Sequence, residues 1–165
     1  MDFDYHVQNA IRAHEGQTRR WDKRTPYSIH PLWCATTILT ETTLPQDLRE
    51  DGALALLYHD VKEDTKDFEL PHDLPSRVRE WVDGMTFEGA SVPGGSDIER
   101  QHIWSRPPEI RLFKLYDKTS NLLDVSWAPL HRITIYKDYT RQLIEDVVPR
   151  YGELNIVRMA RAFVL

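Results

Sequence analysis

Residues 53–64 read Ala-Leu-Ala-Leu-Leu-Tyr-His-Asp-Val-Lys-Glu-Asp, an apolar run that ends abruptly in polar and charged side chains. Pro45, shortly before this run, suits the start of a helix, and the sequence predicts one that extends through Leu48 to Tyr58. Because the end of this helix is dense in alanine and leucine, we expect it to lie in the middle of a hydrophobic core. The polar residues that follow therefore stand at the end of an apolar helix.

The segments on both sides of this helix also carry apolar residues at helical spacing. They predict further helices near residues 3–14, 31–39, 78–85, 108–121, 130–147 and 151–162. Gly16 is a typical end for the first of these, and Pro149 is expected to end or kink the long one. Residues 89–96 are rich in glycine and serine and predict a flexible connection. No run alternates apolar and polar residues over the length of a strand, so the predicted fold is all-α.

The size and composition of the chain narrow the class of protein. Its 165 residues are close to the size of one domain, so we expect residues 1–165 to form a single domain. The formal net charge of −5 argues against non-specific binding to nucleic acid, and the single cysteine excludes an intramolecular disulfide and a cysteine zinc site. There is no apolar run of about eighteen residues and no signal-peptide pattern at the acidic N-terminus. The sequence therefore predicts a cytoplasmic protein with no membrane partner.

The long helix near the C-terminus carries an apolar stripe from Ile133 to Val147. Its residues recur three and four positions apart, which is the spacing of one helix face. The stripe predicts either core packing or an oligomer interface.

A cluster of acids and one imidazole follows the central helix. His59 and Asp60 close the helix, Glu63 lies four residues after His59, and Asp64 lies four residues after Asp60. Residues four apart share a helix face, so these side chains would crowd together. Three carboxylates and an imidazole at the end of an apolar helix would repel and desolvate one another without a cation. The cluster therefore predicts a divalent metal ion, and the alternative is a solvated helix end with ordinary hydrogen bonds.

The remaining metal ligands have to come from distant segments. The candidates are His30, just before Pro31, and Asp117, because both sit where an apolar helical face presents a polar residue inward. Two imidazoles and two carboxylates form a mixed nitrogen and oxygen set, which suits Mn²⁺, Fe²⁺, Co²⁺ or Zn²⁺ better than Ca²⁺. Four protein ligands on an octahedral ion leave two positions for water and substrate, which is typical of a catalytic site.

Four short segments occur in an order and at separations that are specific when taken together. They are Ala-His-Glu-Gly-Gln-Thr-Arg-Arg at 13–20, Pro-Tyr-Ser-Ile-His-Pro at 26–31, Leu-Tyr-His-Asp-Val-Lys-Glu-Asp-Thr at 57–65, and Lys-Leu-Tyr-Asp-Lys at 114–118 with Asn-Leu at 121–122. On these segments the chain resembles the HD-type hydrolase domain of RelA/SpoT proteins. It is most similar to the stand-alone small alarmone hydrolases, which include animal-type enzymes also described as NADPH phosphatases. The resemblance covers about residues 6–125, and the predicted C-terminal helices at 128–163 follow it.

The resemblance implies a single-domain HD-type helical bundle with one divalent ion, usually Mn²⁺, that removes the 3′-pyrophosphate of the phosphorylated nucleotide (p)ppGpp. The implied metal ligands are His30, His59, Asp60 and Asp117, the implied catalytic acids are Glu63 and Asp64, and the implied substrate contacts are Arg19, Arg20, Lys23, Arg24 and Asn121. Glu63 would take a proton from the attacking water or orient that water, and Asp64 would hold the geometry or shuttle a proton. His14 is expected to be structural.

The chain departs from the family at positions that affect substrate fit. Leu123 stands where relatives carry an arginine, Tyr116 where a small residue is common, and Lys62 where an apolar residue is common. No implied metal ligand or catalytic acid is missing, so hydrolysis is expected while the identity of the nucleotide stays open. The alternatives are an NADPH 2′-phosphatase, another HD nucleotide phosphohydrolase, and a nucleotide-binding module without catalysis.

Overall fold

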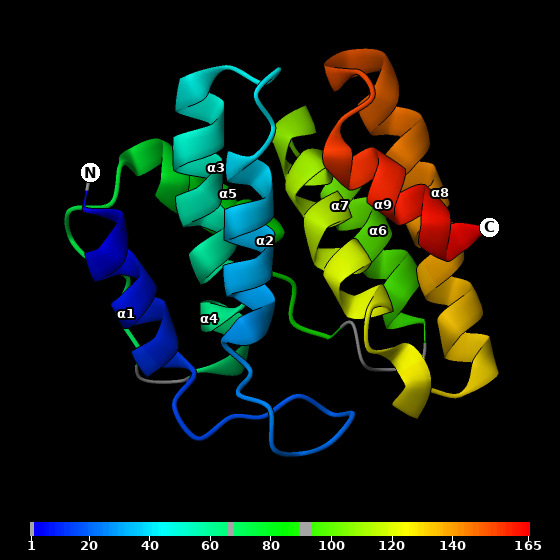
Figure 1. Ribbon diagram of the computed structural model, residues 1–165, viewed down its shortest axis with the longest axis horizontal. Coiled ribbons are helices and arrows are strands. Elements are labelled where there is room, and N and C mark those ends of the chain that lie inside the picture. Colours follow the sequence, from blue (N-terminus) through cyan, green and yellow to red (C-terminus); the bar gives the residue numbers. More distant parts are fainter. Residues whose placement is uncertain (1, 66–67, 90–93) are drawn as a thin grey trace. The chain divides into compact units, whose positions relative to one another are not determined.

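The computed structural model describes residues 2–65, 68–89 and 94–165, and the regular structure in these ranges is helical (Figure 1). The β pairing in the described ranges consists of an isolated antiparallel bridge between Thr18 and Pro26. The prediction of an all-α fold is confirmed. The helices form two compact units, Met1–Thr86 and Phe87–Leu165, and each has buried apolar residues of its own. That the whole chain is one domain stays a prediction.

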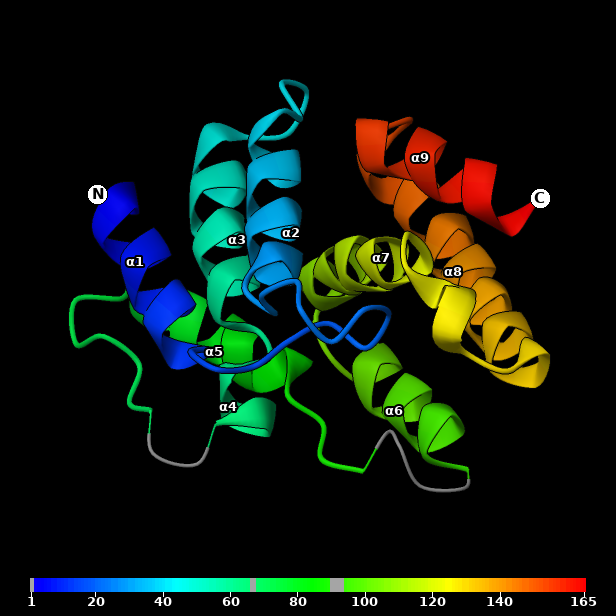
Figure 2. The same cartoon turned by 60° about the horizontal axis from the view of Figure 1, so that its bottom comes forward.

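The first unit is built around one buried helix. It contains α1 (Phe3–Ala13), α2 (Ile29–Leu39), α3 (Gln46–Tyr58), α4 (Val61–Asp64) and α5 (Ser76–Met85). α3 contacts α1, α2 and α5, and α2 and α3 lie side by side in Figures 1 and 2. Pro45 directly precedes α3, and every residue from Gly52 to Tyr58 is buried. The predicted place of this helix in the middle of a core is confirmed.

The predicted end of the central helix at Tyr58 is confirmed, and the acidic cluster after it starts a separate short helix. The helix ends at Tyr58, and His59 and Asp60 form a turn before α4 begins. The backbone nitrogens of Glu63 and Asp64 lie 3.1 and 2.9 Å from the carbonyl oxygen of Asp60, so a new helical turn starts there. His59 and Glu63 therefore do not belong to one continuous helix, whereas Asp60 and Asp64 are joined by the first turn of α4. The turn instead places Asp60 between the buried helix and the short exposed one.

The second unit is a helical bundle with α7 in contact with its other α-helices. It contains α6 (Gly95–Trp104), α7 (Pro108–Leu122), the 3₁₀ turn η1 (Val125–Trp127), α8 (Leu130–Tyr151) and α9 (Asn155–Val164). α7 contacts α6, α8 and α9, and α8 also contacts α9 (Figure 2). Thr140, Leu143 and Val147, from the stripe predicted on the long helix, are buried. This part of the stripe belongs to the core of the second unit.

Two features of the second unit differ from the predictions. α6 was not expected, because its start at Gly95 falls in the stretch predicted as a flexible connection, of which residues 90–93 lie outside the described residues. Pro149 does not end α8, which continues to Tyr151, and the alternative that it kinks this helix stays a prediction. A proline in the last turn removes one backbone hydrogen bond close to where the helix stops in any case. Gly152, with a φ of +82°, follows the last residue of the helix.

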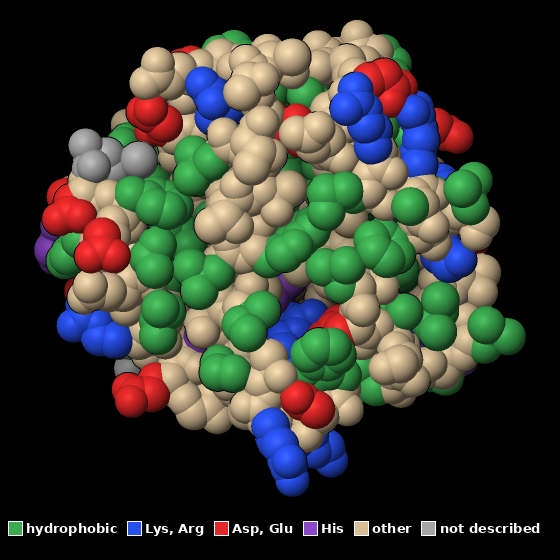
Figure 3. Space-filling model, viewed as in Figure 1, with side chains coloured by type: hydrophobic (Ala, Val, Ile, Leu, Met, Phe, Trp, Pro, Cys, Tyr) green, Lys and Arg blue, Asp and Glu red, His purple; other side chains and the backbone are tan. Residues whose placement is uncertain are grey.

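The surface mixes apolar and charged side chains. On the face shown in Figure 3, apolar side chains and groups of Lys and Arg reach the surface, while histidine is visible only in small patches. His6, His14, His30 and His59 are at most 3% exposed, and all of them belong to the first unit. Within the described ranges, no helix combines the length and the apolar character that crossing a bilayer requires.

Candidate metal centre

Three of the four predicted metal ligands meet where α2 begins and α3 ends. His30 comes from the first turn of α2, and His59 and Asp60 come from the turn between α3 and α4. One ligand atom from each of these residues lies within 4.8 Å of the other two. Because α2 and α3 pack against each other, residues that are distant in sequence come together at this end of the pair.

The distances within this triad suit a single ion. Nε2 of His30 lies 3.3 Å from Oδ2 of Asp60, and Nε2 of His59 lies 3.2 Å from the same oxygen. Ligand atoms at about 2.1 Å from one ion are about 3.0–3.4 Å apart when they occupy neighbouring octahedral or tetrahedral positions. The two histidine side chains are 1% exposed and that of Asp60 is 13% exposed. The donor set and its spacing therefore fit a divalent transition metal ion.

The ring of His59 is oriented for metal binding by a backbone carbonyl. Its Nδ1 lies 2.7 Å from the carbonyl oxygen of Leu56. A carbonyl oxygen only accepts hydrogen bonds, so Nδ1 donates, and the neutral ring presents the lone pair of Nε2 toward Asp60. A hydrogen bond from the second ring nitrogen to a carbonyl is typical of histidines that bind metals.

The surroundings of Asp60 favour its ionised form. The hydroxyl of Tyr27 donates a hydrogen bond to Oδ2 of Asp60 at 2.7 Å. Burial raises the pKa of the Asp60 carboxyl, but His59 and His30, when they are protonated and donate hydrogen bonds to it, outweigh burial and hold this pKa well below its usual range. An ionised carboxylate beside imidazole nitrogens is the form that binds a divalent cation.

The predicted catalytic acids, Glu63 and Asp64, lie on α4 directly after Asp60 and are exposed. Desolvation and the negative charge of Asp60 raise the pKa of the Asp64 carboxyl. The Nε2 group of Gln17 donates a hydrogen bond to the backbone carbonyl of Asp64 at 3.0 Å, which ties α4 to the loop before α2. The fold thus places two acids next to the candidate ligands and in contact with solvent.

The predicted substrate-binding cations lie on a closed loop between α1 and α2. The bridge between Thr18 and Pro26 closes this loop. Near its tip, Lys23 adopts a left-handed conformation with a φ of 55°, and the side chain of Asp22 accepts a hydrogen bond from the backbone N–H of Arg24 at 2.9 Å. The cations are therefore carried by a defined turn rather than by an extended connection.

The four cations differ in what surrounds them. The guanidinium carbon of Arg19 lies 5.3 Å from the centre of the Tyr27 ring, so Arg19 is held beside the residue that contacts Asp60. Arg20, Lys23 and Arg24 are exposed. Arg19 is thus held in contact with a neighbour of the triad.

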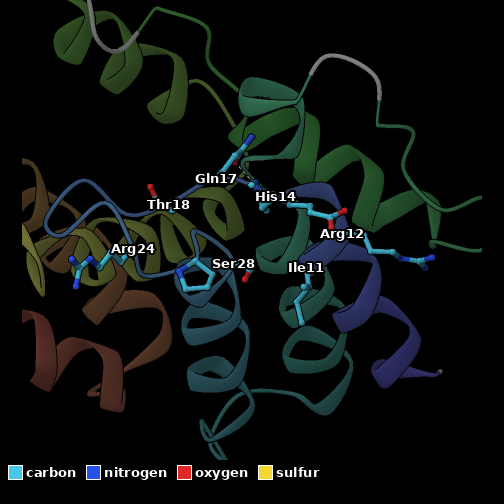
Figure 4. Close-up of a pocket in the computed structure, with 10 residues that line it drawn as sticks. Ile11, Arg12, His14, Gln17, Thr18, Arg24 and Ser28 are labelled. Atoms are coloured by element: carbon cyan, nitrogen blue, oxygen red, sulfur yellow. Dashed lines mark hydrogen bonds between the residues drawn. The ribbon is translucent and has the colours of Figure 1, made fainter.

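A pocket of about 350 Å³ opens between the end of α1 and the loop (Figure 4). Figure 4 shows Arg24 and Arg12 at opposite sides of this pocket, with His14 and Gln17 between them. Nδ1 of His14 lies 2.8 Å from Oε1 of Gln17, and the His14 ring packs 4.8 Å from the ring of Tyr27. These contacts join α1 to the loop and favour the structural role expected for His14.

The fourth predicted ligand, Asp117, belongs to α7 in the second unit. Its Oδ2 lies 2.9 Å from Nζ of Lys114, and its Oδ1 accepts a hydrogen bond from Nδ2 of Asn121 at 2.6 Å. Lys114 also pairs with Glu99 at 2.8 Å. Asp117 and Asn121 are therefore neighbours on one helix, and the addition of Asp117 to the triad stays a prediction.

Two residues of these clusters were missed by sequence reasoning. Tyr27 stands inside the Pro-Tyr segment that carries the resemblance, but nothing in that segment indicates its contact with Asp60. Glu99 lies on α6, in a stretch whose helical pattern was not recognised, and no local signal marked it.

No protein-family model matches the chain, and no curated protein matches it in sequence. Among solved structures, the fold is similar to that of a metazoan ortholog of SpoT that hydrolyses ppGpp and plays a role in starvation responses. The two chains are 22% identical, the match covers 99% of this chain and 96% of the other, and the TM-score is 0.76. At the level of the fold, this similarity confirms the resemblance that the sequence motifs indicated.

Proposed function

We propose that this chain is a metal-dependent phosphohydrolase of a phosphorylated nucleotide, with (p)ppGpp as the first candidate substrate. The observation that carries this proposal is the triad of His30, His59 and Asp60, whose ligand atoms converge on one point. The similarity of the fold to that of a metazoan SpoT ortholog that hydrolyses ppGpp supports the substrate class. A cytoplasmic location and the absence of nucleic-acid and membrane partners stay predictions.

The triad would hold one divalent ion, with Mn²⁺ as the first candidate and Asp117 as the proposed fourth ligand. When bound, such an ion lowers the pKa of a coordinated water and neutralises charge on a phosphoryl oxygen. Asp60 supplies the anionic ligand, because its pKa lies well below the usual range. His59 supplies a ring nitrogen whose orientation is fixed by the carbonyl of Leu56.

The two acids on α4 have separate proposed roles. Glu63 accepts a proton from the water that attacks phosphorus, and it is exposed directly after the triad. Asp64, next to Glu63 on α4, holds the geometry or passes a proton to the leaving oxygen. Water then adds to the phosphorus next to the ribose, the bond from that phosphorus to the 3′ oxygen breaks, and the products are free pyrophosphate and a nucleotide with a 3′-hydroxyl.

The loop between α1 and α2 is the proposed contact for the nucleotide. Arg19, Arg20, Lys23 and Arg24 lie on this loop, and a planar guanidinium can pair with phosphate and stack on a base. Arg19 already stacks on an aromatic ring, that of Tyr27. Asn121, one turn after Asp117 on α7, is the proposed contact to ribose or phosphate.

A nucleotide panel with and without Mn²⁺ tests this function. We expect pyrophosphate from (p)ppGpp only when Mn²⁺ is present, and Glu63→Gln should lower kcat by about 10²–10⁴-fold. Mn²⁺ binding by Glu63→Gln should match that of the unchanged protein, because Glu63 is not a proposed ligand. Glu80→Gln, which changes an exposed acid on α5, is the matched control and should keep full activity.

Each of the other outcomes of the nucleotide panel would assign a different function to this chain. Release of inorganic phosphate from NADPH, with (p)ppGpp left intact, would assign the 2′-phosphatase alternative. Release of phosphate or pyrophosphate from nucleoside mono- or triphosphates alone would assign another HD nucleotide phosphohydrolase activity. Bound Mn²⁺ without any product would leave a nucleotide-binding module and overturn the proposal.

A further inference from the structure

The hydroxyl of Tyr27 touches the same oxygen that both histidines of the triad face. It donates a hydrogen bond to Oδ2 of Asp60 at 2.7 Å. The Nε2 atoms of His30 and His59 lie 3.3 and 3.2 Å from this oxygen. Tyr27 is half-buried at the end of the loop, two residues before α2 begins.

The ring of Tyr27 is held in place independently of this hydrogen bond. The rings of His14 and His30 lie 4.8 and 5.8 Å from it, and the guanidinium of Arg19 lies 5.3 Å from its centre. The backbone nitrogen of Tyr27 lies 3.0 Å from the carbonyl oxygen of Gln17, which fixes the chain on which the ring is carried. Packing on these sides therefore determines the position of the hydroxyl, and the Asp60 carboxylate is oriented by its hydrogen bond to this hydroxyl.

A carboxylate oxygen accepts hydrogen bonds or metal ions along two lone-pair directions. When Tyr27 occupies one direction on Oδ2, the other is left for the side where the two imidazole nitrogens converge. We propose that Tyr27 is a positioning residue whose hydroxyl holds Oδ2 of Asp60 in the orientation that binds the divalent ion. This inference rests on the proposed metal centre and adds to it a residue outside the ligand set.

The proposal separates the hydroxyl of Tyr27 from its ring. Hydrogen bonds to a ligating carboxylate typically change metal affinity by about 10–100-fold when they are removed. Tyr27→Phe keeps the ring contacts with His14, His30 and Arg19 and removes the hydroxyl, which donates to Asp60 and also bonds the carboxyl of Asp64. A role limited to filling space would leave metal affinity unchanged in this variant.

The test is a titration of the metal-free protein with Mn²⁺, followed through the electron paramagnetic resonance signal of free Mn²⁺ and without any nucleotide. We expect the Kd for Mn²⁺ to rise by about 10–100-fold in Tyr27→Phe, with an unchanged circular dichroism spectrum. In the activity assay, excess Mn²⁺ should restore the part of kcat that is lost with the ion, and a remaining loss would belong to the contact of the hydroxyl with Asp64. A Kd equal to that of the unchanged protein would overturn the inference.

Tyr58→Phe is the matched control. It also removes a tyrosine hydroxyl in the first unit, one that is buried and lies 3.1 Å from Nδ1 of His6. We expect its Kd for Mn²⁺ to match that of the unchanged protein, and an equal loss in both variants would overturn the specific role of Tyr27. If the unchanged protein binds no Mn²⁺, it is the proposed function that fails. If it binds Mn²⁺ and Tyr27→Phe binds equally well, only the inference fails.

Discussion

Both units bury polar side chains, but they balance the negative charge of their carboxylates differently. In the first unit, the carboxylate of Asp60 faces the Nε2 atoms of His30 and His59 at 3.3 and 3.2 Å. An imidazole carries a positive charge only when it is protonated, and in its neutral form it offers a lone pair instead. The first cluster is therefore suited to take up a cation from outside the chain.

The second unit carries its cations within the chain. The Nζ atoms of Lys114 and Lys118 lie 2.8 and 3.1 Å from Glu99, and Lys114 lies 2.9 Å from Asp117. These four side chains are at most 7% exposed. Burial by itself lowers the pKa of Lys118, but the negative charges of Glu99 and Asp117 outweigh burial and raise this pKa above its usual range. Two carboxylates and two ammonium groups balance one another in this cluster.

The difference shows how the neighbours of a buried carboxylate decide its chemistry. A carboxylate that faces an ammonium group is already neutralised, whereas one that faces imidazole nitrogens favours a metal ion. Asp117, as the proposed fourth ligand, would have to share its charge between Lys114 and that ion. The lysines give the second cluster an internal charge balance, whereas the histidines give the first an arrangement that favours a metal ion.

Replacing Glu99 by glutamine tests whether the second cluster depends on its internal charge balance. The change leaves two buried lysines against the single carboxylate of Asp117, and breaking a buried pair in this way typically costs about 3–5 kcal/mol. We expect a loss of that size in the free energy of unfolding, measured with urea on the metal-free protein. Lys118→Met in the Glu99→Gln background should recover part of the loss, because it removes the excess charge.

A loss below about 1 kcal/mol in Glu99→Gln would contradict this account, because it is the value expected of a solvent-exposed pair. Equal losses in the single and double variants would also contradict it. In that case the loss would come from altered packing of α6 against α7, and the charge of Lys118 would play no part.

The sequence predicted those elements whose apolar residues repeat over several turns. α5 and α7 have such a pattern. The buried Val78 and Val82 form it in α5, and the buried Ile110 and Phe113 form it in α7. α6 was missed, because its first residues continue a run of glycine and serine and few of its residues are apolar. A helix that is held by contacts with a neighbouring helix, as α6 is by α7, carries little information in its own sequence.

The candidate site was predictable to the extent that its residues stand in recognisable segments. His59 and Asp60 are adjacent in sequence, and His30 stands next to a proline at the start of a helix. The hydrogen bond from Tyr27 to Asp60 joins residues 33 positions apart, and nothing local in either segment encodes it. Such a contact follows from the packing of α2 on α3, which periodicity alone does not determine.

Adding Mn²⁺ to the metal-free protein tests whether the first cluster takes up an outside cation. At an Mn²⁺ concentration 100 times the Kd, the free energy of unfolding should rise by about 2.7 kcal/mol, because the ion binds the folded state alone. Asp60→Asn should remove this rise, since it replaces the anionic member of the triad. Glu80→Gln, an exposed change in the same unit, should keep it. A full rise in Asp60→Asn would mean that the stabilising ion binds elsewhere.

The response to acid should distinguish the two clusters by a smaller effect. Burial raises the pKa of Glu99, but the charges of Lys114 and Lys118 outweigh burial and lower it below the usual value. The stability that Glu99 contributes is therefore complete above about pH 4.3, its value in the unfolded chain, and is lost as the pH falls through the lower pKa of the folded state. One such group changes the free energy of unfolding by at most about 1.4 kcal/mol per pH unit. The gap in stability between the unchanged protein and Glu99→Gln should narrow below about pH 4.3.

Asp64 lies beside the first cluster, and its contribution to stability should change with pH in the opposite direction to that of Glu99. Its pKa is raised by desolvation and by the charge of Asp60, so the folded state binds the proton more tightly than the unfolded chain does. As the pH rises from about 3.9, the unfolded value, through the folded pKa, the unchanged protein loses stability relative to Asp64→Asn. Urea unfolding of both proteins across this range, without metal, measures the difference. A constant difference would mean that neither desolvation nor the charge of Asp60 raises the pKa of Asp64 in the folded protein, and the contrast between the two clusters would then not extend to this residue.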